Sequence, residues 1–104
     1  MKTTIEFLDA VKEKLGVTSD YALAKRLGFS LSAVSSYRTG RRALDDDAAL
    51  TVAIALEIHP FNVIAAVNAE RAKTPEQRAR WSGVMEKFSA SFLNLLLGCG
   101  PHAA

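Results

Sequence analysis

Small polar side chains and arginines lie close together between residues 30 and 42 of this chain. Serine hydroxyls can donate or accept hydrogen bonds at base edges, and a leucine side chain can contact a thymine methyl group. Guanidinium groups bind backbone phosphates or the edges of guanine bases. The residues concerned are Ser30, Leu31, Ser32, Ser35, Ser36, Arg38, Thr39, Arg41 and Arg42. These residue types predict recognition of a DNA duplex and give no support to catalysis.

The charges around this segment are unevenly distributed, although the formal net charge of the chain is only +2. No acidic residue occurs from Tyr21 to Leu44, and three consecutive acids, Asp45 to Asp47, follow directly. The basic residues of the acid-free stretch are Lys25, Arg26, Arg38, Arg41 and Arg42. We expect them to form one basic face, which is the electrostatic footprint that phosphate binding requires. The three acids are expected to stabilise a helix N-terminus.

Two short helices joined by a tight turn would position these side chains. Ser19 and Ser30 are the expected N-caps, because their hydroxyls can accept hydrogen bonds from free backbone N–H groups at a helix start. Gly28 supplies the left-handed backbone conformation that the turn requires. Val34 and Tyr37 are three residues apart, so both can face inward and anchor the second helix. The polar row then lies on the outer face of that helix.

The rest of the chain also has helical periodicity and capping signals, so the expected fold class is all-α. Thr3 and Glu6 form a capping box, and Asp45 is the expected N-cap of a fourth helix. Pro60 is expected at the first position of a fifth helix that ends near Lys73, and Thr74 to Gln77 opens a sixth that reaches Leu97. The residues of the fourth helix expected to face inward are Leu50, Ala53, Ile54 and Leu56.

This pair of short helices resembles the helix-turn-helix of the Cro/lambda-repressor family. In that family a Leu-Ala pair precedes a turn glycine, and an aliphatic residue, an aromatic residue and a second glycine follow at fixed steps. The matching residues here are Leu23, Ala24, Gly28, Val34, Tyr37 and Gly40. The likeness extends from about Thr4 to Ala72. The segments SDYALAKRLG, VSSYRTG, DDDAAL and ERAK resemble those of phage-related proteins from small bacterial phages and prophages.

The resemblance implies a five-helix lambda-repressor-like DNA-binding domain over residues 1–73. It further implies that Leu31, Ser32, Ser35 and Ser36 face the bases, and that backbone amides near Ser19 meet a phosphate. Asp20 stands where the family usually has glutamine. A carboxylate there repels phosphate, although it suits a helix N-terminus.

Residues 74–97 are expected to form an amphipathic helix whose apolar residues repeat at steps of four and three. This seam contains Trp81, Val84, Met85, Phe88, Phe92, Leu95 and Leu96. A heptad seam with aromatic residues is typical of an interface, so we expect homodimerisation through it. The alternative is that the helix packs onto the first five helices of its own chain. Residues 98–104 are expected to form a flexible tail.

Other features limit the possible classes of protein. A single cysteine, Cys99, excludes an intrachain disulfide and indicates a reducing compartment. It is expected to be an inert thiol, with an intersubunit link as the other reading. The N-terminus lacks a signal-peptide core, and the apolar run 92–97 is too short to cross a bilayer. The expected location is therefore the cytoplasm of a bacterial host, on its DNA.

The residues also predict no metal, cofactor, small-molecule ligand or enzyme activity, because no ligand cluster, nucleophile–base pair or phosphate-binding glycine loop occurs. The expected function is that of a dimeric transcriptional regulator, in the manner of a phage repressor, bound to double-stranded DNA. Two other readings stay open. In the first, the chain is a protein-interaction module that binds another protein through its last helix. In the second, it is an antitoxin-like regulator whose last helix masks a toxin.

Overall fold

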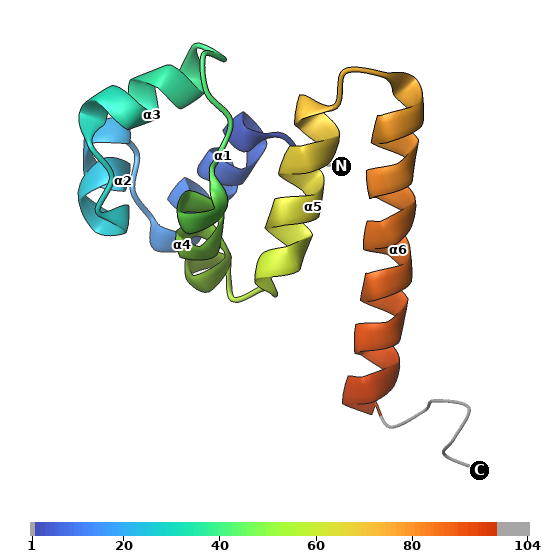
Figure 1. The fold of residues 1–104 in the computed structure, drawn as a ribbon. Coiled ribbons are helices and arrows are strands. Elements are labelled where there is room, and N and C mark those ends of the chain that lie inside the picture. The colour runs from blue at the N-terminus through green and yellow to red at the C-terminus, as the bar shows by residue number, and fades with distance from the viewer. Residues whose placement is uncertain (1, 98–104) are drawn as a thin grey trace.

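The computed structural model describes residues 2–97, with side chains as far as Lys87. This part of the chain contains six α-helices and no strand, which confirms the all-α fold class (Figure 1). The helices are α1 (Thr4–Leu15), α2 (Asp20–Leu27), α3 (Leu31–Arg38), α4 (Asp46–Leu56), α5 (Pro60–Arg71) and α6 (Pro75–Leu97). The expected tail, with Cys99, lies outside the described residues.

Each expected N-cap is found at the residue that the sequence indicated. Thr3 and Glu6 form a complete capping box at α1, and the side chains of Ser19, Ser30 and Asp45 each accept a hydrogen bond from a backbone N–H in the first turn of their helix. At α6, the Thr74 hydroxyl accepts from the Gln77 backbone N–H at 3.1 Å. The Gln77 side chain accepts from the Lys73 N–H rather than from the Thr74 N–H. Helix α5 ends at Arg71, two residues before the expected end.

The hydrophobic core lies between α1, α4 and α5, and the α2–α3 pair packs against one side of it (Figure 1). Its fully buried large side chains are Leu8, Val11, Leu23, Val34, Leu44, Val52 and Val63. Small alanines on α4 and α5 allow these two helices to approach closely, as the burial of Ala49, Ala53 and Ala66 shows. The core thereby holds the α2–α3 pair with one face turned away from the rest of the molecule.

Helix α4 differs from the expectation in the face that it buries. Leu50 and Ile54 were expected to face inward, but they are 44% and 68% exposed. Ala49 and Val52 are buried in their place, beside Ala53, whose expected burial is confirmed. Both stripes of α4 are apolar, so the helical period alone could not select the buried one. The stripe that is rich in alanine packs inward because it permits close contact with α1 and α5.

A partly buried polar contact joins the start of α1 to the end of α5. The Thr4 hydroxyl and the Thr4 backbone N–H both donate to Glu70 Oε1, at 2.8 and 2.9 Å. The same hydroxyl accepts a hydrogen bond from the Leu44 backbone N–H, in the segment between α3 and α4. Thr4 is 1% exposed, so these contacts satisfy polar groups that water cannot reach. They fix the 39–45 segment in place next to α5.

Helix α6 runs antiparallel to α5 and lies beside it (Figure 1). Met85 packs against the core from this side. Twelve residues make α5 about 18 Å long, whereas the 23 residues of α6 make it about 34 Å long. The second half of α6 therefore extends beyond the end of α5. None of the helices described in residues 2–97 is both long enough and apolar enough to cross a membrane.

Candidate nucleic-acid interface

The α2–α3 pair is closed by a three-residue turn of defined geometry. Gly28 has φ 75°, in the left-handed region that glycine favours, and the Phe29 backbone N–H donates to the Ala24 carbonyl at 2.9 Å. Beyond the turn, the Phe29 ring meets the Tyr37 ring edge to face, with centroids 6.0 Å apart. Val34 and Tyr37 are buried as the sequence predicted. The inner face of α3 is thus fixed on α2 and the core.

The outer face of α3 presents the short side chains that the sequence singled out. Exposed along it and at its ends are Ser30, Leu31, Ser32, Ser35 and Thr39, and Ser36 is half-buried. The Ser30 hydroxyl is used as an N-cap acceptor, and the Thr39 hydroxyl donates to the Ser36 carbonyl at 3.3 Å. Ser32 and Ser35 have no such side-chain hydrogen bond within the described residues. Their hydroxyls can therefore donate to or accept from a ligand.

Arg38 lies in a different environment from the one expected of a residue that meets phosphate. Its guanidinium group donates from Nε to Asp20 Oδ2 at 3.2 Å and from NH2 to Asp20 Oδ1 at 2.9 Å, as a two-point fork. NH1 donates to Asp9 Oδ1 at 2.7 Å. The Arg38 side chain is only 22% exposed. Its contacts join α3 to α2 and to α1.

The same contacts explain the acid at position 20. The Asp20 carboxylate also binds Lys12 Nζ at 3.3 Å, so it lies between two cations. Burial raises the pKa of Asp20, but the hydrogen bonds from Arg38 and Lys12 outweigh it and hold the pKa below its ordinary value. Burial likewise lowers the pKa of Arg38, and its bonds to Asp20 and Asp9 give a net rise. Asp20 is thus a partner for Arg38 within the fold.

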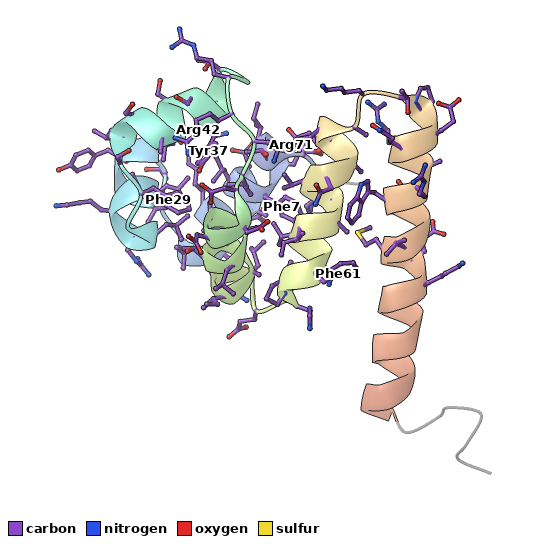
Figure 2. All side chains as sticks on the ribbon, viewed as in Figure 1. Phe7, Phe29, Tyr37, Arg42, Phe61 and Arg71 are labelled. Atoms are coloured by element: carbon purple, nitrogen blue, oxygen red, sulfur yellow. The ribbon has the colours of Figure 1, made fainter. Side chains whose placement is uncertain are left out.

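Arg41 and Arg42 follow α3 and are both exposed. The Arg42 guanidinium carbon lies 5.4 Å from the centre of the Tyr37 ring, and Arg42 NH2 is 3.7 Å from Asp45 Oδ2. Arg41 makes no ion pair in the part of the chain that the structure describes. Both residues line a surface hollow of about 590 Å³ that also contains Arg71 at the end of α5 and two acids, Asp45 and Glu70. Figure 2 shows Arg42 beside Tyr37, on the side of the molecule toward Arg71.

The remaining basic residues expected at the interface, Lys25 and Arg26, lie in the last turn of α2. Both are exposed. Lys25 Nζ lies 5.5 Å from the centre of the exposed Tyr21 ring, a cation–π distance. At the other end of α2, the Ser19 hydroxyl accepts a hydrogen bond from the Ala22 backbone N–H at 3.0 Å. The expected site residues thus lie together on α2, α3 and the segment after it, with Arg38 turned inward.

Comparison with known proteins relates the chain to phages. A family model described as "Phage related protein" matches residues 64–102. The chain is 33% identical over 84 residues to the "Uncharacterized protein Gp-c" of Pseudoalteromonas phage PM2, an alignment that covers 76% of this chain and 90% of Gp-c. The chain belongs to the same family as Gp-c, a family of phage-related proteins. No solved structure matches it.

The matched segment of this phage-related protein includes all of α6. Of the seam residues predicted there, Trp81 and Met85 are half-buried on the α5 side, and Val84 is 43% exposed. The first half of α6 therefore packs within its own chain, as the alternative reading of the sequence held for the whole helix. The side chains of Phe88, Phe92, Leu95 and Leu96 lie outside the described residues. Whether the helix joins two copies of the chain stays a prediction.

Sequence reasoning missed two features of this surface in the phage-related protein. The first is the set of partners of Arg38, of which Asp9 is 29 residues away in the sequence. The sequence did contain a signal for the other partner, Asp20. An acid at this position is unsuited to a phosphate contact, so a cationic partner within the fold could have been expected. The other missed feature is Arg71, which joins the Arg41–Arg42 hollow from a helix far along the chain. No local pattern indicates that proximity.

Proposed function

We propose that this phage-related protein is a sequence-specific transcriptional regulator, which binds double-stranded DNA through a helix-turn-helix formed by α2 and α3. It acts as a homodimer and represses phage or prophage genes by occupying a promoter. In this proposal, the arrangement of α1 to α5 is that of a lambda-repressor-like domain. The organisation into residues 1–73 for DNA binding and 74–97 for dimerisation is part of the same proposal.

One observation supports DNA binding more than any other: a helix whose inner face is anchored while its outer face is short, polar and uncharged. Val34 and Tyr37 fix α3 to the core, and Ser32 and Ser35 are exposed on the other side. A helical hairpin with a purely structural role would not need this row of short polar side chains on its outer face. An α-helix with small side chains fits the major groove, where its N-terminal residues meet base edges. Leu31 and Ser32 are the first two residues of α3.

The arginines divide into two roles in this proposal. Arg41 and Arg42 are exposed just after α3, where the sugar-phosphate backbone borders the groove, so they bind phosphates. Arg38 holds α3 in its orientation through Asp20 and Asp9 and makes no contact with DNA. The reading surface is therefore positioned by an ion-pair network on its inner side. Serine reads bases weakly, so DNA shape carries part of the specificity.

The groove-facing surface can be tested with one added charge. Ser35→Glu places a carboxylate on the outer face of α3, where it would meet the negative potential of the groove and abolish binding. Ile54→Glu is the matched control, because it adds the same charge at an exposed position in the last turn of α4. Duplex fragments selected from the parent genome serve as the probe in gel shifts, and circular dichroism checks the fold. If Ser35→Glu binds the duplex with full affinity, the outer face of α3 is not the surface that contacts DNA.

Arg41→Gln and Arg42→Gln test the phosphate contacts. Each variant should weaken binding to all duplexes alike, and the slope of log K against log salt should become less negative by about 0.9 per lost contact. Arg38→Gln is the control, because the proposal gives this residue no phosphate. An equal change of slope in Arg38→Gln would show that the assignment of roles is wrong.

The homodimer is supported by the different lengths of α5 and α6. Helix α5 can cover only the first half of α6, and the sequence beyond Lys87 contains Phe88, Phe92, Leu95 and Leu96. Burial of each such side chain stabilises by roughly 2–3 kcal/mol, so exposure of all four to water is unfavourable. A second copy of the chain supplies an identical apolar segment. A dimer would also present two α3 helices to two half-sites.

Phe88→Asp tests this interface, with Lys87→Asp as the control one position away, off the seam. Sedimentation velocity should show that Phe88→Asp is monomeric and that Lys87→Asp stays dimeric. A wild-type protein that sediments as a monomer at micromolar concentration would refute the homodimer without affecting the DNA-binding surface.

A further inference from the structure

Another hollow, which is basic, lies where α5 turns into α6. It measures about 480 Å³ and is lined by Asn68, Arg71, Ala72, Lys73, Gln77, Arg80 and Trp81. Three of these residues are cations and none is an acid. Arg71, Lys73 and Arg80 are exposed and make no ion pair within the described residues. An exposed cluster of like charges without counter-charges attracts an anionic partner.

Several uncharged groups of the hollow also suit an anion or a nucleotide. The Gln77 side-chain carbonyl accepts from the Lys73 backbone N–H at 3.1 Å, which leaves the NH₂ group of this amide to donate elsewhere. Trp81 is half-buried and lines the hollow. An indole can pack on a sugar or donate its N–H to a phosphate oxygen. The hollow therefore offers donors and cations and no competing carboxylate.

The position of this hollow connects it to the surface proposed for DNA binding. Arg71 lines both this hollow and the one that contains Arg41 and Arg42. In Figure 1, α3 and the α5–α6 turn lie toward the top of the view, and the 39–45 segment begins there and runs down to α4. The Thr4–Glu70–Leu44 contacts hold the 39–45 segment against α5, so the two hollows have a fixed relation. One continuous polyanion can contact both.

We propose that Arg71, Lys73 and Arg80 form a second phosphate-binding site, which holds the backbone of the same duplex beside the segment that α3 reads. The inference rests on the proposed DNA-binding function and extends its footprint to the α5–α6 turn. The contacts are to phosphate alone, so they add affinity for any sequence and leave base preference to α3. An acidic peptide could also satisfy the three cations. The duplex is favoured because the cluster continues the Arg41–Arg42 surface through Arg71.

Trp81 gives a direct readout, because it is the only tryptophan in the chain. The experiment follows the indole N–H signal of uniformly labelled full-length protein by NMR during titration with duplex, while fluorescence anisotropy of the labelled duplex measures binding. We expect the Trp81 signal to shift as the duplex binds. In Lys73→Gln/Arg80→Gln the duplex should still bind, with the shift lost. In Arg41→Gln/Arg42→Gln binding should weaken, and the shift should persist at saturation.

The salt dependence supplies the second measurement. Loss of two phosphate contacts should make the slope of log K against log salt less negative by about 1.8. The ratio of wild-type to variant affinity should therefore rise about twelvefold when the salt concentration is lowered from about 200 to about 50 mM. Lys14→Gln/Lys87→Gln removes the same charge at other exposed positions and should leave the slope unchanged.

The outcomes separate the two proposals. If the wild type binds duplex but Lys73→Gln/Arg80→Gln changes neither the slope nor the Trp81 shift, the second site is wrong and the helix-turn-helix proposal stands. The second site is also wrong if the control variant changes the slope by the same amount, because the effect would then be one of net charge. If the wild type shows no salt-dependent binding to any duplex, both proposals fail.

Discussion

Replacement of Arg38 by glutamine should destabilise the fold without removing a contact to DNA. The change deletes three hydrogen bonds, two of them the fork to Asp20 at 2.9 and 3.2 Å and the third to Asp9 at 2.7 Å. Exposed ion pairs contribute about 0.2–1 kcal/mol, whereas removal of one partner from a buried pair costs about 3–5 kcal/mol. Arg38 is 22% exposed, Asp20 40% and Asp9 59%, so these pairs lie nearer the exposed limit. We expect a loss of about 1.5–2 kcal/mol.

Thermal and urea denaturation measure this loss. The entropy of unfolding is about 2.1 cal/mol/K per residue, or about 0.2 kcal/mol/K for a chain of this length, so 1.5–2 kcal/mol lowers Tm by about 7–10 °C. A double-mutant cycle with Asp20→Asn should return a coupling energy of about 1 kcal/mol. A coupling energy within about 0.3 kcal/mol of zero would refute the structural role of this pair.

The pH dependence supplies an independent check on the same pair. The pKa of Asp20 is lower in the folded state than its ordinary value, so the folded state favours the ionised carboxylate. The stability that Asp20 contributes is therefore fully present above its unfolded pKa of about 3.9 and is lost as the pH falls through the folded pKa. Arg38→Gln should make the loss of unfolding free energy below about pH 4 smaller than in the wild type. Parallel pH curves for the two proteins would contradict this reasoning.

Three further substitutions test other parts of the fold. Gly28→Ala should cost about 1 kcal/mol by urea denaturation, because φ is 75° there and nothing lies within 4 Å of an added Cβ, so only backbone strain is introduced. Thr4→Val should cost about 1–3 kcal/mol in the same assay, because it leaves the buried Leu44 N–H without an acceptor. Glu57→Gly should raise Tm by a few degrees, because Glu57 ends α4 with φ 59° and its ion pair to Lys14 is exposed; an unchanged or lower Tm would show that the left-handed glutamate is not strained.

Local signals predicted most of the helix boundaries. Ser19, Ser30 and Asp45 cap the helices that they were expected to cap, because N-capping depends on contacts between residues two or three apart. The end of α4 had no such signal. Glu57 takes the left-handed conformation that glycine takes after α1 and α2, and no residue type at this position announces it. Packing of the following segment onto the core, which includes Ile58, determines that end instead.

The candidate site was predictable where it depends on one helix and unpredictable where it depends on several. The outward row on α3 follows from helical spacing, since burial of Val34 and Tyr37 places Ser32 and Ser35 on the other side. The orientation of Arg38 depends on Asp9, which the fold brings close from 29 residues away. From the sequence, Arg38 and Arg41 were both expected on the basic face, because a count of charges treats neighbouring arginines as equivalent. Only the positions of the carboxylates separate them.

The ion pairs of Arg38 are directly relevant to the base-facing role proposed for α3. If α3 reads bases as proposed, its three serines make few strong contacts, so the affinity should depend on the angle at which the helix enters the groove. The fork from Arg38 to Asp20 fixes α3 relative to α2 on the inner face, and the Arg42 guanidinium group lies at a cation–π distance from Tyr37 near the end of the same helix. In the proposed function Asp20 makes no phosphate contact, and its hydrogen bonds with Arg38 hold α3 against α2 instead. Under the proposed function, the fixed inner face would compensate for weak base readout on the outer face, and the proposed phosphate contacts of the 39–45 segment and the α5–α6 turn would supply the affinity that the serines cannot.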